Sequence, residues 1–183
     1  MQTRGDDATL EAPHLPRPRR QSRLWKWAAP VAATALLVGW VAWYVTTPED
    51  LPTDSQTITA SGIVGQPLYV GMFSTPSGFD RGLHMSGIKV TAKASTKLSI
   101  TPLLCRHGSI QVTTEPNQFC ASLDNPAGQR LDAGDSIVLR LDSTQTVLAD
   151  IDQIRIAFQE GLRWGTKPAG HAKAVVSLVQ RGQ

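Results

Sequence analysis

The sequence predicts a mainly β protein, with a single N-terminal transmembrane helix followed by an antiparallel immunoglobulin-like β-sandwich; a small β-barrel is the alternative. Two observations predict this. Residues 27–45 form an uncharged run of 19 positions, and about 20 apolar residues cross a bilayer core. From residue 57 onward, short segments alternate apolar and polar side chains between clusters of Gly, Pro, Asn and Asp. A period of two is typical of half-buried antiparallel strands.

Residues 1–26 are expected to be a disordered basic cytoplasmic tail, because they are polar and interrupted by three prolines. They carry six basic and three acidic side chains. The excess of Lys and Arg beside the apolar run predicts a cytoplasmic N-terminus and an extracytoplasmic C-terminal domain in the cell membrane. The residues that would set this topology are Arg17, Arg19, Arg20, Arg23 and Lys26.

The segment 27–45 is predicted to be a transmembrane helix that acts as an uncleaved signal anchor. Four of the five tryptophans lie at its two ends, and indole rings prefer the headgroup level of a membrane. A cleaved signal peptide is the main alternative, but bulky residues fill 43–45, where a peptidase requires small ones. A buried helix of a soluble domain is a weaker alternative, because the run lacks a polar face.

Residues 46–56 are rich in proline, acidic and hydroxyl residues, so we expect an extended, solvated linker. The remaining segment, 57–183, is long enough for one extracytoplasmic β-sandwich domain with its own core. Residues 49–183 contain 12 basic and 12 acidic side chains. The basic excess thus belongs to the N-terminal tail, and the outer domain shows no basic stripe with interleaved aromatic residues. Both observations argue against nucleic-acid binding.

Eight segments of this domain have the composition of strands, and the 88–94 and 153–159 segments alternate most clearly. Seven or eight strands in a domain of this length fit a sandwich. The expected strands are Thr57–Ile63, Pro67–Phe73, Gly87–Ala94, Lys97–Leu104, Ser109–Thr113, Ser136–Leu141, Gln153–Gln159 and Ala174–Gln180.

Cys105 and Cys120 are the only cysteines, and both fall in the predicted extracytoplasmic domain. An even count in an oxidising compartment predicts a disulfide bond. The two residues are too close in sequence to form the inter-sheet bridge of an antibody domain. We therefore expect the bridge to hold the loop between them.

Catalytic patterns are weak in this chain. A basic tail, one span, a β domain and a cysteine after a strand resemble the setting of sortases, which would make Cys105 a nucleophile with His84 or His107 as base and Arg106 or Arg130 as oxyanion stabiliser. Sortases carry Thr-x-Thr-Cys at that strand, whereas this chain reads Thr-Pro-Leu-Leu-Cys at 101–105. The aspartates of 132–152 fit no cation-binding loop. We expect no enzyme activity, no cofactor and no metal.

Two segments are the better candidates for binding. Residues 74–85 are glycine-rich, and residues 161–168 contain the only tryptophan of the outer domain, flanked by cations. Trp and Arg often anchor interfaces, although such rings also cover the ends of sandwiches. The candidate binding residues are Phe79, Arg81, Met85, Arg163, Trp164 and Lys167.

The sequence thus favours a single-pass membrane protein that acts by protein–protein contact, as an accessory or scaffold subunit of a bacterial envelope assembly. Its expected partners are the lipid bilayer and another envelope protein. The alternative is an envelope-facing module that binds a glycan or small molecule, and a cysteine transpeptidase or peptidase is the third hypothesis. Self-association is left open.

Overall fold

The computed structural model describes residues 25–181, with side chains from residue 31 onward. These residues belong to two compact units, Met1–Trp40 and Val41–Gln183, and each unit is considered by itself. The predicted disordered tail lies outside the described residues. So do the topology residues Arg17, Arg19, Arg20 and Arg23 and the side chain of Lys26.

Helix α1 spans Trp25–Thr46. It ends where the hydroxyls of Thr46 and Thr47 donate to the carbonyls of Ala42 and Trp43, at 2.9 and 2.7 Å, and Pro48 cannot continue the helical hydrogen bonding. Its large apolar side chains from Val31 to Trp43 are exposed. Among the described residues, however, no helix combines the length and hydropathy needed to cross a membrane. The transmembrane assignment of 27–45 is therefore not supported by this part of the chain.

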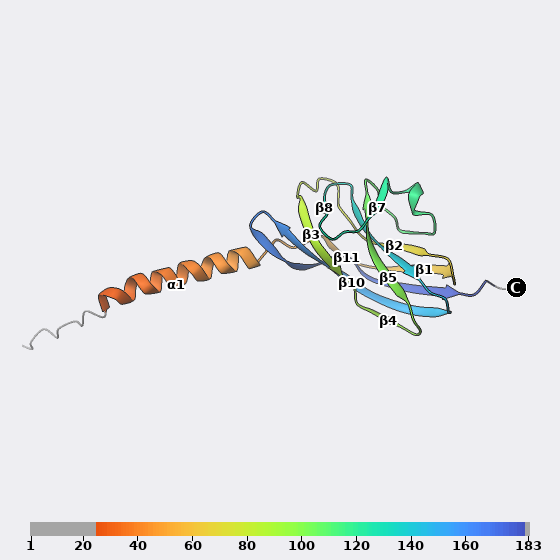
Figure 1. The fold of residues 1–183 in the computed structure, drawn as a ribbon, viewed down its shortest axis with the longest axis horizontal. Helices are drawn as coiled ribbons and strands as arrows, with labels where there is room; N and C mark the ends of the chain where they lie inside the picture. The colour runs from red at the N-terminus through yellow and green to blue at the C-terminus, as the bar shows by residue number, and fades with distance from the viewer. Residues whose placement is uncertain (1–24, 182–183) are drawn as a thin grey trace, which may run out of the picture. The chain divides into compact units, whose positions relative to one another are not determined.

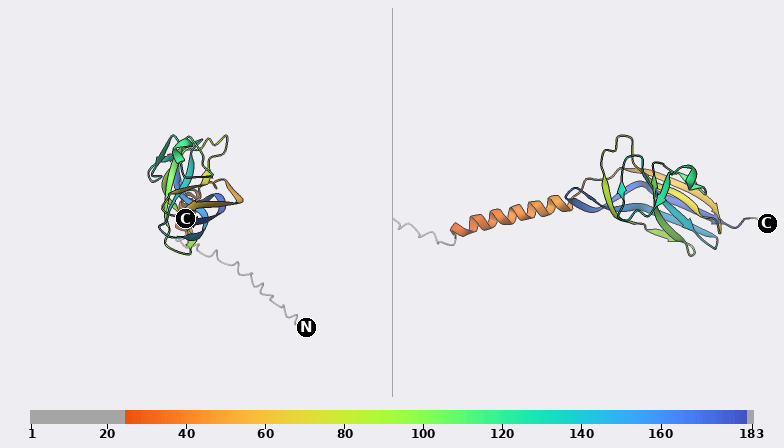
Figure 2. Two further views of the ribbon diagram at one scale, coloured as in Figure 1. Left: turned by 90° about the vertical axis from the view of Figure 1, so that its right-hand side faces the viewer. Right: turned by 45° about the horizontal axis from the view of Figure 1, so that its top comes forward.

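Two sheets build the rest of the described chain (Figures 1 and 2), as the mainly β prediction requires. The larger sheet has the order β1-β11-β10-β3-β8, with β4 also paired to β10, and the smaller sheet has the order β6-β2-β9-β5-β7. The bounds are β1 Thr53–Ile63, β2 Leu68–Ser74, β3 Leu83–Lys89, β4 Ala92–Ala94, β5 Ser99–Arg106, β6 Val112–Thr113, η1 Pro116–Gln118, β7 Ser122–Asp124, β8 Arg130–Leu131, β9 Ser136–Asp142, β10 Val147–Glu160 and β11 Arg163–Val179.

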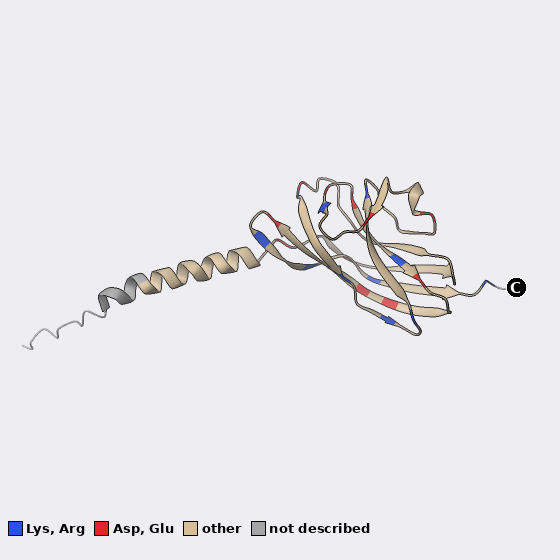
Figure 3. Cartoon of the chain, in the orientation of Figure 1, with Lys and Arg blue, Asp and Glu red and all other residues tan. Residues whose placement is uncertain are grey.

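The larger of two hydrophobic clusters joins residues of both sheets, because alternate side chains of each strand point inward. In β10, Ile154, Ile156 and Phe158 are buried, while Arg155 and Gln159 are exposed. The smaller sheet supplies Leu68, Val70, Ile137 and Leu139 among others. Acidic and basic residues are interspersed over the domain (Figure 3), in line with its even charge count.

Four details differ from the predicted pattern. The sheets are not wholly antiparallel, since β1 pairs parallel with β11. The predicted strand Gly87–Ala94 is interrupted between β3 and β4, and Ser109–Thr113 is reduced to β6. Of the predicted linker 46–56, residues 53–56 belong to β1, and Pro48 and Leu51 are buried. The stretch between α1 and β1 is therefore shorter than the predicted linker; Pro48 and Leu51 pack against the domain, and the other residues of 46–56 are exposed.

Candidate functional site

The most prominent feature of the domain is the long hairpin of β10 and β11, whose turn projects from the body of the domain in Figures 1 and 2. Glu160 and Arg163 form the last cross-strand pair, so the turn contains only Gly161 and Leu162. Gly161 has φ 59°, and glycine at the first position of a two-residue turn suits type II′. The sequence Gly-Leu therefore makes a tight hairpin out of a segment expected to be a binding loop.

The inner face of this hairpin is covered by residues 44–52, which comprise the end of α1 and the chain between α1 and β1. Arg163, Gly165 and Lys167 face inward, since their cross-strand partners in β10 include the buried Ile156 and Phe158. The guanidinium of Arg163 lies 4.2 Å from the ring centroid of Tyr44. Pro48 packs so closely on Gly165 that a Cβ there would lie 2.8 Å from its Cγ. The Nζ atom of Lys167 lies 2.7 Å from Oδ1 of Asp50.

Arg81 fastens the same chain to the end of β10. Its Nε and Nη2 atoms each donate to a carboxylate oxygen of Glu160 at 2.7 Å, and its Nη1 donates to the carbonyl of Asp50 at 3.0 Å. The hydrogen bonds from Arg81 lower the pKa of Glu160 despite its partial desolvation, and those bonds raise the pKa of Arg81. Residues from both segments predicted to bind, 74–85 and 161–168, thus contact the same connection to α1.

The outer face of the hairpin is open and forms one side of a groove. His84, Gln159 and Trp164 lie side by side on β3, β10 and β11. The groove is about 720 Å³ and is also lined by Ser86, Ala157 and Thr166. Trp164 is 58% exposed. The groove lining is therefore mixed: it includes the apolar Met85 and Phe158 as well as polar side chains, and Trp164 contributes an exposed indole.

The six predicted binding residues fall into three groups. Phe79 and Met85 are buried in the core, and Arg81, Arg163 and Lys167 hold the 44–52 segment. Only Trp164 is exposed on the groove side. Sequence reasoning missed His84 and Gln159 as groove residues. Alternation counted outward from Trp164 places Thr166 on its face, but the strands that supply His84 and Gln159 become neighbours only through the sheet order.

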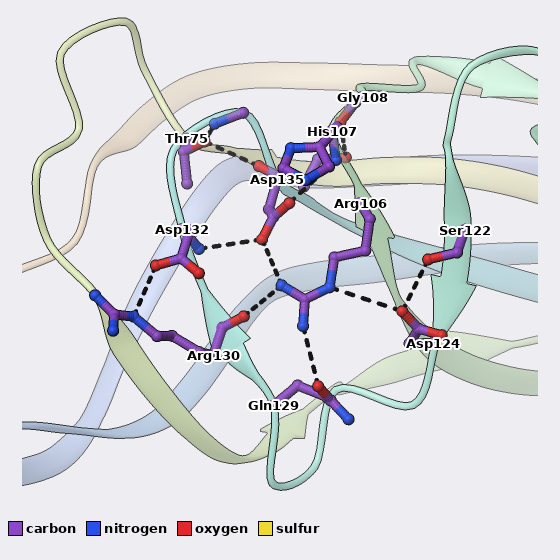
Figure 4. Close-up of polar contacts among 12 residues, drawn as sticks. Thr75, Arg106, His107, Gly108, Ser122, Asp124, Gln129, Arg130, Asp132 and Asp135 are labelled. Carbon is purple, nitrogen blue, oxygen red and sulfur yellow. Dashed lines mark hydrogen bonds and ion pairs between the residues drawn. The ribbon is translucent and has the colours of Figure 1, made fainter.

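A second polar cluster lies around Asp135 and is shown in Figure 4. The Asp135 carboxylate is buried and accepts hydrogen bonds from Arg106 Nη1 at 2.8 Å and from the backbone N–H groups of His107 and Asp132, both at 3.1 Å. Arg106 also donates to the carbonyl of Arg130 at 2.7 Å. The cluster therefore ties the end of β5 to the turn before β9 and satisfies its own charges, as a structural network does.

Cys105 and Cys120 form the predicted disulfide bond. In this state the sulfur of Cys105 is not a free thiolate, and Arg106 beside it is engaged by Asp135. Cysteine catalysis would need this bond to be reduced. No group of three His, Cys, Asp or Glu side chains suited to a metal ion occurs in the described part of the chain.

Comparisons with known proteins give this chain no relative: it matches no family model, no curated protein and no solved structure. The hairpin and its groove therefore carry the functional interpretation.

Proposed function

We propose that this chain is a single-pass membrane protein whose extracytoplasmic immunoglobulin-like β-sandwich acts by protein–protein contact, as an accessory or scaffold subunit of a bacterial envelope assembly. The anchor rests on the uncharged run 27–45 with its basic flank. The exposed apolar side chains of α1 from Val31 to Trp43 agree with it, because such a surface needs an apolar environment.

One observation supports a function in protein contact: one face of the β10–β11 hairpin packs against the protein's own chain, and the other face is exposed. The inner face is occupied by the chain 44–52, which Arg81, Arg163 and Lys167 hold in place. The outer face leaves Trp164 exposed beside a groove. An exposed indole on a rigid strand is a typical interface anchor, since little conformational entropy is lost when it is covered.

Site-specific photo-crosslinking in cells that express the full chain tests this function. A photoreactive amino acid is placed at Thr166 in the groove, and Thr144, in an exposed turn at the other end of β10, serves as the matched control. We expect a discrete crosslinked protein from position 166, none from position 144, and loss of the product when Trp164→Ala is added. Equal products from both positions, or none, would argue against a contact surface here.

The predicted location has its own test. Leu148 is 62% exposed and lies in the domain, and both native cysteines are in the disulfide bond. Leu148→Cys therefore supplies a single thiol. We expect a membrane-impermeant maleimide to label it in intact cells, or in spheroplasts where an outer membrane is present. Labelling only after the cytoplasmic membrane is opened would place the domain on the other side.

A glycan- or small-molecule-binding module is the second candidate, favoured by the composition of the groove. His84, Gln159 and Thr166 supply hydrogen-bonding groups beside the indole of Trp164, and a concave site with a few convergent polar groups is typical of ligand binding. Calorimetric titration of the full chain with soluble envelope glycans tests it. Saturable heat that is lost in Trp164→Ala and kept in Thr144→Ala would favour this function over protein contact.

A further inference from the structure

We propose that the turn of the β10–β11 hairpin, Gly161-Leu162, inserts into the headgroup region of the lipid bilayer and is a second membrane contact of this protein. The inference rests on the proposed membrane anchor and extends it from the helix to the β domain. It assigns a lipid surface, in place of a protein or a soluble ligand, as the partner of Leu162.

The first argument is position. Arg163 lies over the ring of Tyr44, with 4.2 Å between guanidinium carbon and ring centroid. Tyr44 belongs to the last turn of α1, within the same compact unit as the hairpin. Leu162 directly precedes Arg163, and adjacent Cα atoms are about 3.8 Å apart. The hairpin turn is therefore held beside the end of the helix, where a proposed span would leave the hydrocarbon core.

The second argument is the chemistry of the turn. Leu162 is 77% exposed, more than any other large apolar side chain among the described residues. Two-residue turns usually present polar residues to water, whereas this one presents a leucine. Trp164 lies two residues further along the strand, and Trp and Tyr rings prefer the boundary between headgroups and hydrocarbon. The sequence Leu-Arg-Trp thus has the composition of an interfacial segment.

The third argument is charge. The acidic residue that directly precedes the turn, Glu160, has both carboxylate oxygens bound by Arg81 at 2.7 Å. Arg163 stands on the opposite strand. At the turn itself an anionic lipid surface therefore meets a neutralised carboxylate and an arginine. In the neighbouring 44–52 segment, Asp50 is paired with Lys167 at 2.7 Å, and Glu49 is exposed. Basic groups near such a surface favour binding, so Arg163 favours contact of the turn with lipid, whereas the exposed Glu49 opposes it.

The test uses the full chain reconstituted in vesicles of phosphatidylcholine and phosphatidylglycerol. Leu162→Cys and Leu148→Cys are labelled with a polarity-sensitive fluorophore; both positions are exposed leucines, and Leu148 lies at the opposite end of β10. Because Cys105 and Cys120 are paired, each variant offers one thiol. Circular dichroism checks that both variants keep the β fold.

We expect blue-shifted, brighter emission at position 162 relative to detergent, with strong quenching by headgroup-labelled lipid, and no shift at position 148. Flotation at alkaline pH reports the anchor separately. If the chain floats but position 162 responds like position 148, the inference is overturned and the anchor stands. If the chain does not float, the anchor fails and the inference falls with it. If position 162 shifts only when a partner protein is added, the occupant is protein and the lipid assignment is wrong.

Discussion

Replacing Arg81 by Ala should destabilise the domain by about 2–3 kcal/mol. Arg81 makes two charged hydrogen bonds to Glu160 and one to the carbonyl of Asp50. The side chains of the pair are 16% and 26% exposed, so the loss should lie between the 0–1 kcal/mol of a surface pair and the roughly 3–5 kcal/mol of a buried one. At about 3 °C per kcal/mol for a domain of this size, Tm should fall by roughly 6–9 °C.

Urea unfolding of the full chain in detergent, followed by near-UV circular dichroism, measures this loss. Arg81→Lys should recover less than half of it, since an ammonium cannot bind both carboxylate oxygens as the planar guanidinium does. Arg155→Ala is the matched control, because Arg155 is exposed on the outer face of the same hairpin. If the unfolding free energy of Arg81→Ala lies within about 0.5 kcal/mol of wild type, the hydrogen bonds of Arg81 to Glu160 and Asp50 do not stabilise the connection to α1, and the reasoning fails.

The same pair predicts a pH dependence with a defined sign. Hydrogen bonds from Arg81 hold the pKa of Glu160 below its ordinary value of 4.5. A group whose pKa is lowered by folding adds stability that is fully present above its unfolded pKa and is lost as pH falls through the folded one. The difference between wild type and Glu160→Gln should therefore be largest above about pH 5 and should shrink in more acidic buffer. A difference that grows below pH 4.5 would have the wrong sign.

Three further predictions concern the rest of the fold. Asp135→Asn should cost about 2–4 kcal/mol, because one of its two accepting oxygens becomes a donor that faces N–H groups; the half-exposed Asp132→Asn should cost under about 1 kcal/mol by the same urea assay. Reduction of the disulfide, which closes a 15-residue separation, should lower stability by about 3 kcal/mol, and an unchanged urea midpoint would contradict this. Gly161→Ala should cost about 1 kcal/mol because of its positive φ, and Leu162→Ala should leave the midpoint unchanged.

The β class could be predicted from the sequence because alternation is a local property of each strand. Ile154, Ile156 and Phe158 alternate with polar residues and are buried as expected. The disulfide could also be predicted, from the even cysteine count and the expected oxidising compartment. The hairpin could not, because Pro168, Gly165 and Gly170 interrupt the 163–179 strand with residues that strands usually avoid. Tertiary pairing overrides that local preference: Gly170 has φ 70° at the register shift of the hairpin.

The interaction partners of the charged residues could not be predicted from the sequence, for a different reason. Arg81 meets Glu160 across 79 positions, and Lys167 meets Asp50 across 117. The local sequence does not distinguish a cation that binds its own chain from one that binds a ligand. The sequence alone therefore could not show that Arg163 and Lys167 contact the 44–52 segment. Only the sheet order, in which β10 lies between β3 and β11, decides which side chains share a face.

The sheet order places the two sets of β11 side chains in different surroundings. Successive side chains of β11 point to opposite faces, so Arg163, Gly165 and Lys167 face the 44–52 segment while Trp164 and Thr166 face the groove. Because the turn has only two residues, the register of the two strands is fixed. A slip by one residue would turn the cations outward and bury the indole against Pro48. The contacts of Arg163 and Lys167 with the 44–52 segment and the exposure of Trp164 are therefore consequences of a single register of β10 and β11.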